Sequence, residues 1–144
     1  MKSYRALCIG PLVLLIVIAG CGGGSGFDPN KVVVIVSPAT VAIPASGQVT
    51  LQASVTSSPA PVVNWFIAEL TTNGASGAQC NWVGGTPPAG PCPDGTIQQV
   101  TVGNSQTVTY YAPGISGTFH VIAEWTLWGS PVIKEGTSVI TVGP

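Results

Sequence analysis

Short runs in which apolar side chains alternate with threonine, serine or glutamine recur along most of the chain. Residues 49–56 show the pattern most clearly, since Val, Leu, Ala and Val alternate there with Thr, Gln, Ser and Thr. An alternation of period two is typical of a β-strand with one buried and one solvated face. Turns rich in glycine and proline separate the runs, and about seven such strands predict an all-β Greek-key sandwich. The further strand-like runs are residues 32–36, which are β-branched throughout, and residues 41–43, 62–68, 96–102, 107–111, 119–126 and 136–142.

Of the tryptophans, Trp65 is expected in the core of this sandwich, and Trp125 in the core or at an end of the sandwich. Trp65 shares a strand face with Val63 and Ile67, and Trp125 lies in register with Phe119 and Val121. The last run is ambiguous, because Val139 lies on the face opposite to that of Ile140 and Val142, so its buried side stays open.

Charged side chains are rare. Asp, Glu, Lys and Arg make up 6% of the chain, whereas soluble domains usually carry about 25%. The apolar fraction of 45% excludes a disordered chain, because disorder requires low hydrophobicity and high net charge. Affinity for nucleic acid comes mainly from lysine and arginine on phosphates. The composition therefore excludes a nucleic-acid partner.

The first 20 residues have the layout of a secretory signal. Lys2 and Arg5 precede an apolar run at residues 7–18, which is shorter than the roughly 20 apolar residues that span a bilayer. The run ends in Ile-Ala-Gly-Cys at residues 18–21, which resembles the lipobox of bacterial lipoproteins. The resemblance implies a signal peptide at residues 1–20 and a lipid on Cys21.

By this resemblance, the lipid on Cys21 is expected to anchor the protein to a membrane of the cell envelope. The residue after Cys21 is glycine rather than aspartate, and by the same resemblance this favours the outer membrane or the cell surface. Residues 21–31 then form a glycine-rich, flexible linker. Residues 32–144 are expected to form one domain.

Within that domain, several segments resemble bacterial immunoglobulin-like domains of the Big type. The resemblance implies an immunoglobulin-like β-sandwich used for adhesion, spacing or display, without catalytic residues or cofactors. The chain departs from antibody domains near Ala53 and Ala123, where the expected B and F strands carry no cysteine. The matching segments are residues 34–40, 44–48, 63–65, 110–113, 119–123 and 138–142.

An insert at residues 71–95 has no strand periodicity and is longer than an ordinary connection. It contains Cys80 and Cys92, which we predict to form a disulfide because the chain is exported. The bridge either limits proteolysis of the insert or makes it a rigid platform for Trp82. A metal site is not expected, since zinc takes four ligands and His120 is the one imidazole.

Catalysis is not expected either. His120 lies on the polar face of its predicted strand, and Glu124, four residues on, is about 13 Å away along the strand. A partner for His120 from another strand remains open, as does an approach between Glu69 and Asp94, which flank the insert. No carboxylate pair is positioned by local spacing, so the chain is predicted not to be an enzyme.

Two functions remain. The first is a lipid-anchored envelope module with a non-catalytic interaction, adhesion or structural role and a protein or polysaccharide partner. The alternative is a carbohydrate-binding module in which Trp82 and Trp128, expected in loops, stack on sugars.

Overall fold

The computed structural model describes residues 27–56, 63–69, 80–83, 92–99, 106–127 and 129–144. The predicted signal peptide, Cys21, the glycine-rich residues 22–26 and Trp128 lie outside these ranges, as does most of the insert. In the part of the chain that is described, no helix is long and apolar enough to cross a membrane.

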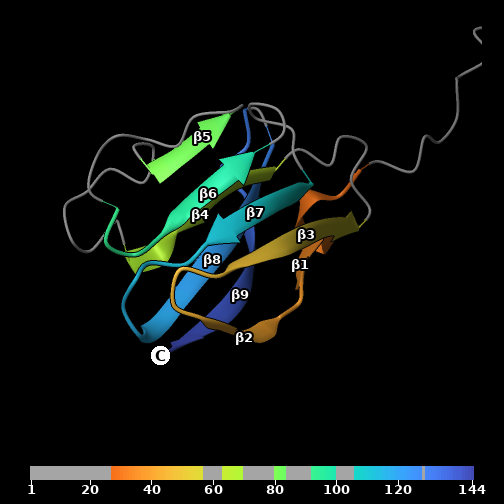
Figure 1. Cartoon of the computed structure of the whole chain (residues 1–144). Coiled ribbons are helices and arrows are strands. Elements are labelled where there is room, and N and C mark those ends of the chain that lie inside the picture. Colours follow the sequence, from red (N-terminus) through yellow and green to blue (C-terminus); the bar gives the residue numbers. More distant parts are fainter. Residues whose placement is uncertain (1–26, 57–62, 70–79, 84–91, 100–105, 128) are drawn as a thin grey trace, which may run out of the picture.

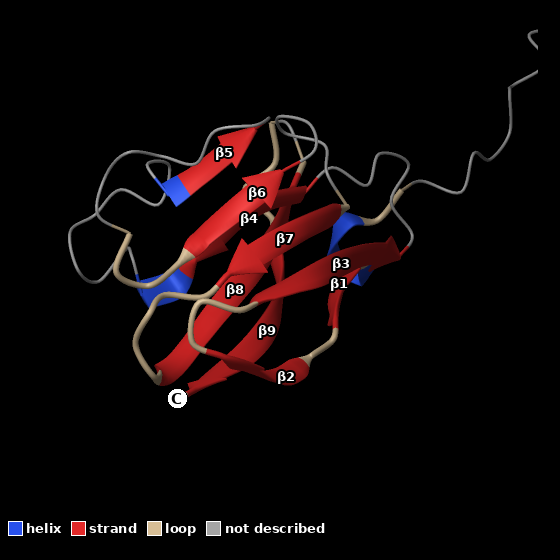
Figure 2. Cartoon of the chain, in the orientation of Figure 1, coloured by secondary structure: helices blue, strands red, loops and turns tan. Residues whose placement is uncertain are grey.

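The described residues contain nine strands and the 3-10 turn η1 (Pro29–Lys31), joined by loops and turns (Figures 1 and 2). The strands are β1 (Val33–Ser37), β2 (Thr40–Pro44), β3 (Gln48–Thr56), β4 (Val63–Ile67), β5 (Asn81–Val83), β6 (Thr96–Gln99), β7 (Thr107–Tyr111), β8 (Gly117–Thr126) and β9 (Ile133–Gly143).

The strands form two sheets, with orders β1-β3-β7-β6-β5 and β2-β9-β8-β4. Neighbours are antiparallel except for the parallel pairs β2–β9 and β5–β6. In immunoglobulin notation, β1, β3, β7 and β6 take the places of strands A, B, E and D, and β4, β8 and β9 those of C, F and G. The described strands therefore form an immunoglobulin-like β-sandwich. The alternation predicted the sandwich, and the resemblance implied its immunoglobulin-like form. After β1 the chain crosses to the four-stranded sheet, where β2 is the edge strand next to β9.

The core lies between the sheets and consists of the inward residues of each alternation. Trp65 and Trp125 are buried as expected, with 2% and 1% of their surfaces exposed. Trp65 is in register with Ala123, which is also fully buried. The small alanine in β8 leaves room for the neighbouring indole where antibody domains place a cysteine.

β9 resolves the ambiguity of the last run. Its inward residues are Gly136, Ser138, Ile140 and Val142, and Val139 lies on the outer face. The inward face lacks an apolar pattern in its first half because β1 passes close to it there. A Cβ atom on Gly136 would lie 2.7 Å from the carbonyl oxygen of Val34, and the buried Ser138 hydroxyl donates to the carbonyl oxygen of Pro38 at 2.7 Å.

The insert contains a strand that the sequence analysis missed. β5 adds to the edge of the five-stranded sheet, parallel to β6, with Trp82 opposite Gln98. Parallel neighbours need a crossover of about a dozen residues, which the chain between Val83 and Thr96 supplies. A three-residue strand is too short to show periodicity in the sequence.

Replacement of Gly136 by alanine should destabilise the fold, because the added methyl group would meet the backbone of β1. We expect a loss of about 1–3 kcal/mol in the free energy of unfolding, measured by urea denaturation. Gly143→Ala, in the same strand, is the control, since a Cβ atom there has no neighbour within 4 Å. Equal stability of the two variants would contradict the close approach of β1 and β9.

Candidate functional site

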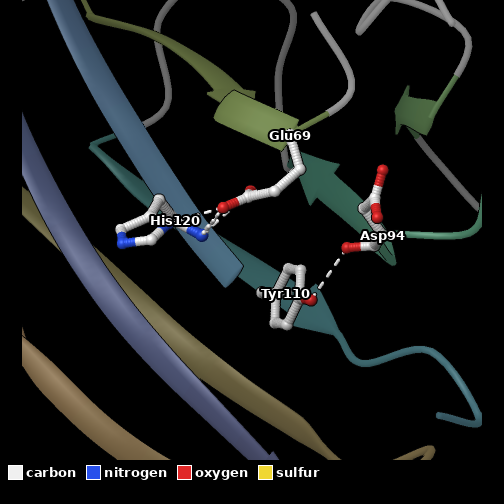
Figure 3. Close-up of polar contacts among 4 residues, drawn as sticks. All are labelled: Glu69, Asp94, Tyr110 and His120. Carbon is white, nitrogen blue, oxygen red and sulfur yellow. Dashed lines mark hydrogen bonds and ion pairs between the residues drawn. The ribbon is translucent and has the colours of Figure 1, made fainter. Parts of the chain in front are cut away.

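Glu69 holds the imidazole of His120 at the edge of the four-stranded sheet (Figure 3). β4 ends at Ile67, which pairs with Val121 of β8, so the backbone N–H of His120 lies beyond the last strand pair. The Glu69 carboxylate oxygens accept from this N–H at 3.0 and 3.1 Å. One of them also lies 2.5 Å from Nδ1 of the imidazole. Glu69 is thus the partner for His120 from another element, and it continues the hydrogen bonding of the sheet with a side chain.

A carboxylate that orients an imidazole is one part of a catalytic triad. The arrangement also needs a hydroxyl or thiol that the imidazole activates. Within the described residues, no hydrogen bond joins the His120 ring to such a group, and its side chain is 43% exposed. The observed contacts of the Glu69–His120 pair therefore fasten the chain after β4 to β8.

Tyr110 of β7 ties the end of the insert to the sheet. Its buried hydroxyl donates to the carbonyl oxygen of Asp94 at 2.9 Å (Figure 3). Burial raises the pKa of Tyr110, and the negative charges of Glu69 and Asp94 raise it further. Gly95 permits this packing, because it has a φ of +94° and a Cβ atom there would lie 2.7 Å from the Tyr110 hydroxyl. The negative charges of Glu69 and Asp94 thus both act on one buried tyrosine.

The predicted disulfide between Cys80 and Cys92 is present, with a Cα–Cα distance of 5.7 Å. It joins the residue before β5 to the segment that leads into β6. The Asn81 side chain adds a second fastening, since its Nδ2 donates to the carbonyl oxygen of Trp65 in the other sheet at 2.7 Å. Among the described residues, no three His, Cys, Asp or Glu side chains gather into a group that would hold a metal ion.

Trp82 lies in β5 rather than in a loop, and it is half-buried. Its ring packs against Tyr111 of β7, with 5.3 Å between the centroids and 36° between the planes. The Tyr111 hydroxyl donates to Oε1 of Gln98 at 2.9 Å. The indole nitrogen is buried and has no hydrogen-bond partner within the described residues. Among these residues the ring is positioned by packing, which includes the contact with Tyr111.

Uncharged polar side chains lie beside this aromatic pair on the outer face of the five-stranded sheet. The strand registers align Thr50, Thr109, Gln98 and Trp82 in one row across four strands. Gln48, Tyr111 and Thr96 form the adjacent row. These seven residues are called here the hydroxyl–aromatic face. No residue of β1, β3, β5, β6 or β7 carries a charge.

The four-stranded sheet, in contrast, carries charged side chains. Its outer face carries His120 and the cross-strand pair Glu124 and Glu135. The sequence analysis did not single out Gln98 or the threonine rows, although the alternating threonines of β3 and β7 indicated the threonine rows. Of the two tryptophans predicted to bind sugars, Trp82 belongs to this face.

No protein-family model and no curated protein sequence matches the chain. Among solved structures, one similar chain belongs to a structure on T cell specificity and activation by the bacterial superantigen toxic shock syndrome toxin-1. It is 16% identical with a TM-score of 0.44, and the match covers 78% of this chain and 99% of that one. A chain of a marsupial T cell receptor is 14% identical with a TM-score of 0.41, over 78% of this chain and 52% of the receptor chain. The fold assignment here comes from the strand order and registers.

Removal of the Glu69 carboxylate should destabilise the edge of the four-stranded sheet. Glu69→Ala leaves the His120 N–H without its protein partner, and we expect a loss of about 1 kcal/mol in the free energy of unfolding. Glu124→Ala is the matched control, because this carboxylate lies opposite Glu135 and its removal relieves like-charge repulsion. Equal losses in both variants, measured by urea denaturation, would rule out the role of Glu69.

Tyr110 should make the fold sensitive to alkaline pH. The unfolded chain releases the tyrosine proton near pH 10, whereas the folded chain retains it to higher pH. Stability should therefore fall as the pH rises above about 10, because the unfolded state then binds fewer protons. Tyr110→Phe should lose about 0.5–1.5 kcal/mol at pH 8 and show a smaller further loss at pH 11. Tyr111→Phe should keep the full alkaline loss, and an unchanged pH profile in Tyr110→Phe would contradict this assignment.

Proposed function

We propose that the chain is a lipid-anchored, immunoglobulin-like module of the cell envelope that acts by non-catalytic binding. The lipobox-like sequence at residues 18–21 and the glycine-rich tether support the anchor. The main support for binding is how the polar groups are distributed. The groups with catalytic potential, Glu69 and His120, contact each other in a structural role, whereas the hydroxyl–aromatic face carries uncharged donors and acceptors.

The start of the described chain also fits a tethered module. Phe27 packs edge-on against Trp125, with 6.0 Å between the ring centroids. Trp125 lies at the end of β8 where β9 begins, and β9 runs from there to Gly143 at the opposite end of the sandwich (Figure 1). Residues 21–27 span at most about 20 Å. A lipid on Cys21 would hold this end of the domain near the membrane and leave the outer faces of both sheets at its sides.

The partner in this proposal is a protein or a polysaccharide. Carbohydrate binding remains the second candidate function, and one observation favours it. The structure brings Trp82 together with Tyr111, so an aromatic surface exists on the sheet without Trp128.

The anchor is tested by labelling cells with radioactive palmitate and separating their membranes from the soluble fraction. Cys21→Ala should abolish the label and release the protein from the membrane fraction, because the thiol that carries the lipid is gone. Cys8→Ala, which changes a cysteine within the predicted signal peptide, should keep both the label and membrane association. Label that persists in Cys21→Ala would disprove lipid anchoring at this residue.

A further inference from the structure

We propose that the hydroxyl–aromatic face binds a neutral polysaccharide, which stacks on Trp82 and Tyr111 and runs across the threonine and glutamine side chains. The inference rests on the proposed function only in that the domain acts by binding. It does not depend on the lipid anchor. Three properties of the face support it: a fixed aromatic pair, rows of neutral hydrogen-bonding groups and the absence of charge.

The aromatic pair is held in place before any ligand arrives. Tyr111 is fixed by its hydrogen bond to Gln98, and Trp82 packs on Tyr111. The strand that carries Trp82 is fastened by the Cys80–Cys92 disulfide and by the contact of Asn81 with the other sheet. Sugar rings present C–H groups on their faces, which pack on flat aromatic rings. A rigid aromatic surface lowers the entropy cost of such a contact.

The rows beside the aromatic pair match the other surface of a sugar, its hydroxyl groups. Threonine hydroxyls and glutamine amides both donate and accept hydrogen bonds, as sugar hydroxyls do. The row from Thr50 through Thr109 and Gln98 to Trp82 crosses four strands, a width of about 14 Å at the usual strand spacing. A surface of this extent suits several linked sugar rings rather than a single one.

The lack of charge selects the class of ligand. An acidic polysaccharide would require lysine or arginine, and the strands of this sheet carry neither. A protein partner is less favoured, because the anchors of protein interfaces are mainly tryptophan, tyrosine and arginine in a desolvated centre. Here the aromatic pair lies at one side of a field of threonine and glutamine. Neutral, hydroxyl-rich chains are the ligands that complement such a face.

The test must separate binding from folding, since Trp82 also packs β5 onto the sheet. Thr109→Lys places a charged side chain in the middle of the face without removing either aromatic ring. Thr137→Lys is the matched control, since Thr137 is an exposed threonine on the outer face of the opposite sheet, in β9 beside Ile122. Thr50→Lys, at an exposed position of the same face, serves if Thr109→Lys unfolds. Circular dichroism melting shows that each variant is folded.

The full chain, purified in detergent, is run on native affinity gels that contain neutral glucans, mannans or galactans, with polygalacturonate and heparin as acidic comparisons. We expect retardation by at least one neutral polysaccharide and none by the acidic ones. Thr109→Lys or Thr50→Lys should weaken the affinity at least tenfold, and Thr137→Lys should leave it unchanged.

Three outcomes would overturn the proposal: no retardation by any neutral polysaccharide, stronger retardation by the acidic ones, or an equal effect of Thr137→Lys. The same gels run with Cys21→Ala should give unchanged polysaccharide affinity. Failure of palmitate labelling would therefore refute the anchor while the gels still report on the face. If palmitate labelling succeeds but no neutral polysaccharide retards the protein, polysaccharide binding is refuted and the lipid anchor is not.

Discussion

The two sheets are held together by packing of the inward side chains, because the cysteines in the described residues, Cys80 and Cys92, pair with each other and not across the sandwich. Trp65 and Trp125 occupy the interior. Alanine at position 123, in register with Trp65, makes room for the indole. Because this apolar core supplies the stability, the outer faces of the sheets need few charges for folding. Their composition can therefore serve solubility and binding.

The polar side chains that could take part in chemistry instead form hydrogen bonds that join segments of this sandwich. Glu69 satisfies a backbone N–H of β8 that β4 is too short to reach. Tyr110 and Asp94 attach the end of the insert to β7. Ser138 joins β9 to the turn before β2. These contacts all join segments that the strand ladders leave apart, and β5 of the insert extends the sheet on which the hydroxyl–aromatic face is built.

Strands with a strict alternation could be predicted from the sequence, since one buried face imposes a period of two on the residues. This holds for β3 and β8, and for the burial of Trp65 and Trp125. β5 could not be predicted, because three residues show no period. The inward face of β9 could not be predicted either, since Gly136 and Ser138 stand where apolar residues would mark it. Small residues stand at these two positions because β1 and the residues after it pass close by, and the local sequence of β9 gives no sign of this approach.

The sequence by itself determined the class of fold, the core tryptophans, the pairing of Cys80 with Cys92 and the limit that low charge sets on chemistry. The fold class, the tryptophans and the limit on chemistry follow from local periodicity and composition. The disulfide follows from the expectation that an exported chain pairs its two remaining cysteines. The tertiary structure alone decided that Glu69 meets His120, 51 residues away, and that Trp82 meets Tyr111 above Gln98. Such contacts depend on which strands become neighbours and in which register. Strand order is set by the packing of the whole sandwich, and no local pattern specifies it.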